Sequence, residues 1–215
     1  MISLQNVSKT YVIGGKVSVP AVREVSLEIA DGEFVIITGR SGSGKTTLLN
    51  LMAGLTCPTA GQILLDGVAA WNLPDQEQAL IRNTKIGFVF QFPSLMPALT
   101  ALDNVLLPTM FFKQGESAGR LRQGDAERQA RARRLLEEVG LADKLTAYPR
   151  QLSAGQQQRV VIARALINQP EVLLADEPTS DLDERTELEI MELFREVHLR
   201  KGVTIVMVTH SSELT

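Results

Sequence analysis

The sequence predicts an α/β fold in which a mixed β-sheet is covered by helices and interrupted by a helical insertion. Three observations support this prediction. Continuously apolar runs alternate with helical patterns in the first and last thirds of the chain, and segments near the amino terminus alternate apolar and polar residues. Residues 93–152 instead show helical patterns joined by polar loops. Alternating strands and helices are typical of a parallel sheet with helices on both faces.

Two kinds of strand are expected. Alternation of apolar and polar residues between glycines predicts antiparallel strands over Ser3–Val7, Ala21–Ile29 and Gln62–Leu65. More continuous apolar runs predict buried parallel strands, each covered on both faces, over Phe34–Ile37, Val172–Ala175 and Val203–Val208, with Ile86–Phe90 joining them.

The helical patterns predict one domain, 1–215, whose core comprises 1–92 and 153–215 and whose helical subdomain spans about 93–152. Apolar residues at helical spacing predict helices over Lys45–Met52, Asp75–Arg82, Ala101–Phe112, Ala126–Val139, Gln156–Asn168 and Glu184–Leu199. The domain is therefore a core interrupted by an insertion.

Composition excludes several classes of protein. The chain has 215 residues, of which 44% are hydrophobic and 22% charged, as in an ordinary globular domain. A net charge of -3 argues against nucleic acid as a partner. The single Cys57 rules out an intramolecular disulfide, which fits a reducing compartment. No apolar run approaches the roughly 18 residues that span a bilayer, so work at a membrane would require another subunit.

Residues 39–46 read Gly-Arg-Ser-Gly-Ser-Gly-Lys-Thr and directly follow an apolar run. Glycines let the backbone curl around a polyphosphate and point its amide hydrogens inward. Lys45 would supply a charge to the outer phosphates and Thr46 a hydroxyl ligand to Mg²⁺. The alternative is a glycine turn followed by a solvated lysine. The nucleotide-binding segment is expected to comprise Gly39, Arg40, Ser41, Gly42, Ser43, Gly44, Lys45, Thr46 and Thr47.

Two carboxylates, Asp176 and Glu177, end the apolar run at 172–175 and precede Pro178, which cannot extend a strand ladder. Asp176 is suited to hold magnesium directly or through water. Glu177, turned the other way by strand alternation, could take a proton from an attacking water. The alternative is a pair of exposed acids at the end of a strand.

Ser153 and Gln156 have the spacing of a capping box at a helix start. A capped helix start is also an anion site, and Gly155 would leave room for close approach. Because the loop at 39–46 already cradles one triphosphate, this second start suggests a nucleotide that belongs to another subunit.

Together these segments resemble the ATP-binding-cassette ATPase family over nearly the whole chain, which implies a P-loop NTPase core with a mixed sheet, an antiparallel β subdomain and an inserted helical subdomain. The motifs that carry the resemblance, in family order, are 39–46, Gln91, Leu152-Ser153-Ala154-Gly155-Gln156, Asp176-Glu177, Ser180-Asp181-Leu182-Asp183 and His210.

The resemblance implies a role for each matching residue. Gln91 would sense magnesium and the attacking water, Glu177 would be the general base, and His210 would contact the γ-phosphate. Ser153 and Gly155, with Gln156, would bind the nucleotide held by the opposite subunit. Asp181 would communicate between the two subunits of the dimer. Tyr11 would stack on adenine; the alternative is a half-buried aromatic. Asp183 is expected to cap the helix at Glu184.

The sequence departs from the family pattern in two places. Ala154 replaces the glycine that is usual in the signature, which adds a methyl group facing the phosphate. Relatives usually continue with a further strand pair and helix, so a truncated carboxyl terminus is expected.

The function implied is ATP hydrolysis with Mg²⁺ by a head-to-tail dimer of two copies that powers a transporter. The region from Tyr11 to Leu27 and the segment 55–61 resemble the group serving lipoprotein release, macrolide efflux, glycolipid export and cell division. An integral membrane subunit would then be the partner, docked on residues 92–97 at the cytoplasmic face of the membrane; the alternative for that segment is a buried loop anchor. Soluble cassette ATPases of DNA repair or translation, and a small-molecule kinase, are the other functions weighed.

Overall fold

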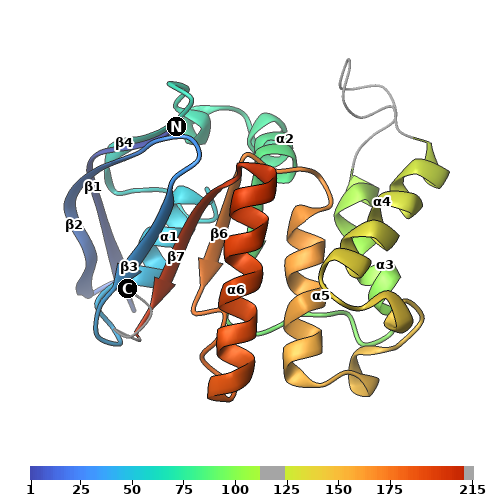
Figure 1. Ribbon diagram of the computed structural model, residues 1–215. Coiled ribbons are helices and arrows are strands. Elements are labelled where there is room, and N and C mark those ends of the chain that lie inside the picture. The colour runs from blue at the N-terminus through green and yellow to red at the C-terminus, as the bar shows by residue number, and fades with distance from the viewer. Residues whose placement is uncertain (112–123, 211–215) are drawn as a thin grey trace.

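A four-stranded parallel sheet forms the centre of the molecule in the computed structural model, which describes residues 1–111 and 124–210 (Figure 1). Its strand order is β3-β7-β6-β5, and the strands are β3 (Phe34–Thr38), β5 (Ile86–Val89), β6 (Val172–Asp176) and β7 (Thr204–Thr209). Because β3 lies at an edge, most of its side chains are half-buried, not fully buried as its apolar run predicted.

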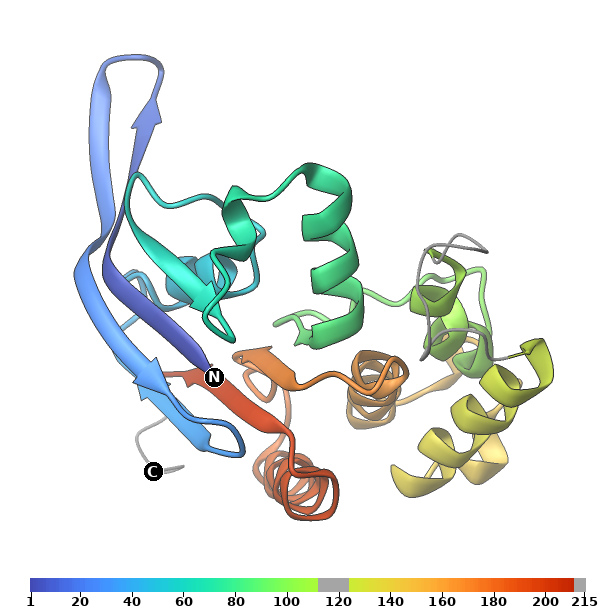
Figure 2. The same cartoon turned by 90° about the horizontal axis from the view of Figure 1, so that it is seen from above.

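The antiparallel strands form a separate sheet of order β2-β1-β4. They are β1 (Ile2–Ile13), β2 (Val17–Ile29) and β4 (Ala60–Leu65). β1 and β2 are much longer than their alternation predicted, because Gly14 and Gly15, with φ of 59° and 71°, turn the chain into a hairpin. This hairpin projects beyond the rest of the molecule (Figure 2).

Side chains of β6 and β7 alternate between two hydrophobic cores, as the two-residue period of a strand requires. Leu173, Ala175, Ile205 and Met207 face α5 (Ala154–Leu166) and α6 (Glu184–Lys201). Val172, Leu174, Val206 and Val208 face α1 (Lys45–Met52) and the antiparallel sheet. Helices α1 and α5 therefore lie on opposite faces of the parallel sheet (Figures 1 and 2).

The helical insertion packs on α5 and shares its core, through buried residues such as Val105, Leu135 and Leu136. It contains α3 (Ala101–Leu106), α4 (Asp125–Glu138) and the 3₁₀ segments Leu107–Phe111, Ala142–Lys144 and Pro149–Gln151. The end of the expected helix at Phe112 lies outside the described residues. α2 (Asp75–Lys85) follows a short 3₁₀ turn, Ala70–Asn72, and Asn83 of α2 donates to the Pro108 carbonyl oxygen of the insertion at 3.3 Å.

Helix boundaries agree with the sequence where a local signal sets them. α1 begins and ends at the predicted residues. α5 begins at Ala154, two residues before the predicted start, because Ser153 is itself the N-cap. α6 runs to Lys201 and ends at Gly202, whose φ of 64° is the left-handed conformation that terminates many helices.

Candidate active site

The loop at residues 39–46 connects β3 to α1 and leaves the start of α1 without a side-chain cap. Gly44 has a φ of 93°, and a Cβ atom there would lie 2.2 Å from the Ala21 carbonyl oxygen. Gly42 also has a positive φ, of 78°. Because the first turn of α1 contains no acidic residue, its orphan amides and positive helix end favour an anion at this loop.

Lys45 is buried, and its ammonium group lies against the loop. Its Nζ atom donates to the carbonyl oxygens of Gly39, at 2.7 Å, and Arg40, at 3.2 Å. The same Nζ atom lies 3.6 Å from Oε1 of Glu177. Glu177 directly follows β6, which is separated from β3 by β7 in the sheet. The lysine of the loop and the proposed base are thus in contact.

Glu177 follows β6 directly and connects Lys45 to His210. Its Oε2 atom lies 3.1 Å from Nδ1 of His210, which follows β7, because the carboxyl ends of these parallel neighbours meet at one sheet edge. Glu177 has a φ of 43°, a left-handed conformation that costs a non-glycine residue about 1–3 kcal/mol. Its amide donates to the Val208 carbonyl oxygen at 2.9 Å, which helps to hold that conformation.

Thr46 and Asp176 form the second polar pair of the site. The Thr46 hydroxyl lies 3.0 Å from Oδ1 of Asp176, whose residue is only 5% exposed. Burial raises the pKa of the Asp176 carboxyl, as does Glu177, while the Thr46 hydrogen bond and Lys45 oppose that rise. No cluster of three or more His, Cys, Asp and Glu side chains in residues 1–111 and 124–210 could hold a metal ion alone.

Gln91 and Tyr11 come from other elements than this cluster. Gln91 follows β5, which pairs with β6, so it emerges at the same sheet edge as Asp176. Tyr11 lies on the projecting part of β1 and is 39% exposed. Lys9 was not identified from the sequence: its Nζ lies 5.1 Å from the centre of the Tyr11 ring and donates to the Cys57 carbonyl oxygen at 2.7 Å. The i,i+2 spacing, which puts two strand residues on one face, was the available signal.

At the start of α5, Ser153 and Gln156 form the predicted capping box. The Gln156 amide donates to Ser153 Oγ at 3.3 Å, and the Ser153 amide donates to Gln156 Oε1 at 3.0 Å. Gly155 differs from expectation, because it is buried and a Cβ atom there would lie 2.5 Å from Cγ2 of Thr186. The space at Gly155 therefore allows α5 to pack on α6, rather than leaving room for a ligand.

The segment before α6 is exposed at Asp181 and capped at Asp183, as expected. Asp183 Oδ1 accepts from the Thr186 amide at 3.1 Å, and Oδ2 accepts from the Thr186 hydroxyl at 2.6 Å. No hydrogen bond within the described part of the chain joins the starts of α5 and α6 to the loop at 39–46. One chain thus assembles Lys45, Thr46, Asp176, Glu177 and His210, and leaves Ser153 and Asp181 apart.

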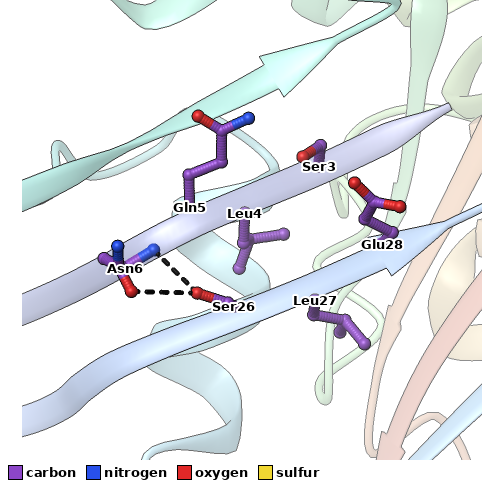
Figure 3. A pocket seen from close by; sticks show the side chains of 7 residues that line it. All are labelled: Ser3, Leu4, Gln5, Asn6, Ser26, Leu27 and Glu28. Carbon is purple, nitrogen blue, oxygen red and sulfur yellow. Dashed lines mark hydrogen bonds between the residues drawn. The ribbon is translucent and has the colours of Figure 1, made fainter.

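A hollow of about 490 Å³ lies elsewhere, on strands β1 and β2 (Figure 3). It forms where a bulge interrupts the pairing between Leu4 and Val7. There Asn6 has a φ of 50°, and its amide and side chain both hydrogen-bond to the Ser26 hydroxyl. Because none of its lining residues belongs to the phosphate loop, this hollow is separate from the nucleotide site.

None of the helices in the described ranges combines the length and the apolar composition needed to cross a bilayer.

Comparison with known proteins places the chain in a family. Residues 22–180 match the family model described as ABC transporter. The chain is 45% identical over 210 residues to the macrolide export ATP-binding/permease protein MacB of Syntrophobacter fumaroxidans, covering 98% of this chain and 28% of that protein. It is 41% identical over 214 residues to the lipoprotein-releasing system ATP-binding protein LolD of Syntrophus aciditrophicus, covering 100% of this chain and 92% of that protein.

A solved structure matches with a TM-score of 0.87 at 44% identity, covering 100% of this chain and 90% of the other. It is the ATP-binding cassette MJ0796 of Methanocaldococcus jannaschii, a dimer in a post-hydrolysis state bound to ADP and Pi. The similarity confirms the predicted α/β fold class. The chain therefore belongs to the ABC transporter family, in which it is an ATP-binding cassette ATPase, the ATP-binding subunit of a transporter.

Proposed function

We propose that this ATPase powers a transporter that exports its substrate or extracts a lipid or lipoprotein from the membrane. The similarity to MacB and LolD, whose names state macrolide export and lipoprotein release, supports this direction of transport. The observation that carries the chemistry is the contact series Lys45–Glu177–His210 beside the Thr46–Asp176 pair. These contacts bring Lys45, a phosphate-binding cation, and Glu177, a candidate base, together at the carboxyl ends of the parallel strands.

In this proposal the amides of residues 39–47 and the Lys45 ammonium hold the phosphates of ATP. The uncapped start of α1 supports that role, because its free amides need an external acceptor. Thr46, Asp176 and Gln91 fit Mg²⁺, because hydroxyl, carboxylate and amide oxygens are the hard ligands it prefers. Bound Mg²⁺ would neutralise charge on the phosphate oxygens. Tyr11 would stack on adenine with the ring face that Lys9 leaves open.

Glu177 is proposed as the general base that orients and deprotonates the attacking water. His210, at 3.1 Å, would hold the other carboxylate oxygen and contact the γ-phosphate. To donate to the phosphates, Lys45 would give up part of its present contacts with the Gly39 and Arg40 carbonyl oxygens and Glu177.

Replacing Glu177 with glutamine tests this assignment. The amide keeps the shape and the hydrogen bond to His210 but accepts no proton, so hydrolysis should fall about two to four orders of magnitude. ATP affinity, measured by titration with a fluorescent nucleotide, should stay within about twofold of the unsubstituted protein. Undiminished phosphate release by this variant would remove Glu177 from the mechanism.

We also propose that two copies bind ATP between them, the start of α5 in one copy completing the phosphate loop of the other. α1 and α5 pack on opposite faces of one sheet, and within the described residues no hydrogen bond joins the start of α5 to the loop at 39–46, which supports this arrangement. Ser153 suits the role, because its oxygen accepts the capping bond while its hydroxyl proton is free to donate. Gln156 and Asp181 would complete the shared site, with the backbone of Gly155.

The partner proposed in the membrane is an integral transporter subunit, which would hold the chain at the cytoplasmic face. Exposed apolar side chains after Gln91 support a docking surface, with Phe92 66% and Met96 50% exposed. We expect Phe92→Glu to abolish co-purification with the integral membrane subunit of the transporter. Leu199→Glu, at an 80% exposed position on α6, should not. Full ATPase activity with no such partner would instead favour a soluble cassette ATPase.

A further inference from the structure

Arg164, near the end of α5, holds the backbone that follows Gln91. One guanidinium nitrogen donates to the Ser94 carbonyl oxygen at 2.9 Å. The other donates to the Ser94 hydroxyl at 2.9 Å and to the Pro93 carbonyl oxygen at 3.3 Å. These contacts join parts of the chain that are seventy positions apart, and they lie two and three residues beyond Gln91.

The charge of Arg164 depends on this loop for its stabilisation. No carboxylate in the described ranges forms an ion pair with it, and burial lowers the pKa of the guanidinium. The backbone it binds is also constrained, because Ser94 has a left-handed φ of 43° that is unfavourable for a serine. A planar guanidinium can satisfy several acceptors at fixed angles, which a lysine ammonium on a flexible stem does less well.

The far end of the same segment is held independently by Asn104 of α3. This side chain is fully buried and accepts from the Met96 amide at 2.8 Å. It donates to the carbonyl oxygens of Met96, Leu99 and Thr100, at 3.2, 3.1 and 2.9 Å. The segment thus has one attachment to α3 and another, closer to Gln91, to α5.

Helix α5 is a rigid support for the nearer attachment. Val160, Val161, Ile162 and Ala163 immediately precede Arg164 and are fully buried in the core. The same helix begins at the capping box of Ser153, one end of the proposed shared nucleotide site. A displacement of α5 would therefore move the backbone next to Gln91 together with Ser153.

We propose that Arg164 is a positioning residue that fixes the segment after Gln91 so that the Gln91 side chain reaches the magnesium and water of the site. This inference rests on the role proposed above for Gln91. Arg164 touches neither nucleotide nor metal; it acts through the Pro93–Ser94 backbone.

Arg164→Met tests the inference, with Arg159→Met as the matched control. Arg159 lies on the same helix and donates to the Val139 carbonyl oxygen and to Glu189, both at 3.1 Å, so it holds the helix without touching the loop. Three quantities are measured for each variant. They are the rate of hydrolysis as a function of Mg²⁺ concentration at saturating ATP, the ATP affinity without Mg²⁺, and the Tm. Arg164→Lys and Gln91→Ala are measured in parallel.

For Arg164→Met we expect kcat to fall roughly tenfold to a hundredfold, the scale of a misplacement of about 1 Å. The Mg²⁺ concentration for half-maximal activity should rise several-fold, as in Gln91→Ala, while ATP affinity without Mg²⁺ is unchanged. Arg159→Met should lower Tm but keep kcat and the Mg²⁺ response within about twofold. Arg164→Lys, which retains the charge, should shift both parameters in the same direction by less.

Three results would overturn the inference. If Gln91→Ala changes the Mg²⁺ response but Arg164→Met lowers only Tm, or if Arg159→Met shifts kcat as much, Arg164 is a structural residue and the role of Gln91 stands. If Gln91→Ala leaves the Mg²⁺ response unchanged, the proposed role of Gln91 fails, and the inference fails with it.

Discussion

The starts of α1 and α5 both present amide groups to an anion, yet only one of them is complete within the chain. At α1, Gly44 provides no side-chain cap, and the amides of the first turn have no side-chain acceptor. At α5, Ser153 and Gln156 satisfy each other's backbone amides. The first helix start therefore leaves its amides available to a ligand, whereas two amides of the second are satisfied within the chain.

This difference indicates how a cassette can bind its own nucleotide in one step and associate with a second copy in another. An uncapped, glycine-rich start gains most from the phosphates of its own nucleotide. A capped start keeps its shape in the free subunit, and the Ser153 hydroxyl proton and the remaining first-turn amides are left to donate. Three substitutions at helix starts would test the contrast, and they are ordered by the size of the expected effect.

The largest effect is expected for Gly44→Ala, which would show how completely the loop depends on its backbone. The added Cβ would lie 2.2 Å from the Ala21 carbonyl oxygen at a φ of 93°, so the loop must move. We expect ATP to bind about a hundredfold more weakly, measured by titration with a fluorescent nucleotide.

The control is Gly202→Ala, which also has a positive φ, of 64°, but meets no atom within 4 Å. It should lose about 1 kcal/mol of stability and keep its ATP affinity. Equal loss of affinity in both variants would show that backbone strain, rather than contact with Ala21, matters.

Ser153→Ala should have an intermediate effect with two components. Loss of the cap on α5 should cost about 1 kcal/mol of unfolding free energy. If the hydroxyl also donates to the nucleotide of the second copy, loss of that charged hydrogen bond should reduce hydrolysis roughly tenfold. Denaturant unfolding and phosphate release measure the two components separately.

Thr100→Ala serves as the comparison, because Thr100 forms the same kind of capping box at the start of α3. It should lower stability to a similar extent, about 1 kcal/mol, without changing hydrolysis. A Ser153→Ala variant that loses only stability would limit this serine to its cap and contradict the shared site.

The smallest effect concerns the charged cap of α6, which contrasts with the neutral cap of α5. The Thr186 hydroxyl and amide lower the pKa of the Asp183 carboxyl. Its contribution to stability is therefore present above the unfolded pKa, about 3.9, and is lost as the pH falls through the lower folded value.

Asp183→Asn keeps a good capping residue and removes the titration. Unfolding free energy measured between about pH 6 and pH 2.5 should fall less steeply in the variant than in the unsubstituted chain. Identical slopes would mean that the Asp183 cap contributes equally in both protonation states.

The elements that carry the candidate site were predicted from the sequence where neighbouring residues define them. The glycines of the loop and the capping residues Ser153 and Asp183 act through backbone groups a few positions away. The carboxylates at 176–177 are marked by the end of an apolar run, but their partners Thr46, Lys45 and His210 are distant in the sequence. The length of the β1–β2 hairpin was underestimated, although Gly14-Gly15 flanked by β-branched residues is a strong hairpin signal. Pro20 interrupts the second strand pattern, because proline is unfavourable inside a strand.

Contacts between distant parts of the chain were beyond the sequence. The space at Gly155 was interpreted as room for a phosphate, but Thr186 occupies it. Arg164 was one charge among several on a helix, and only folding brings it to Pro93 and Ser94.

By itself, then, the sequence determined the fold class, the phosphate loop, the helix caps and the order of the motifs, because each depends on backbone preferences and periodicities read over a few residues. Tertiary structure decided that Lys45 meets Glu177, that α1 and α5 occupy opposite faces of the sheet, and that Arg164 reaches the segment after Gln91. These contacts arise from the register of β6 and β7 and from helix packing, in which every side chain's position depends on the whole core.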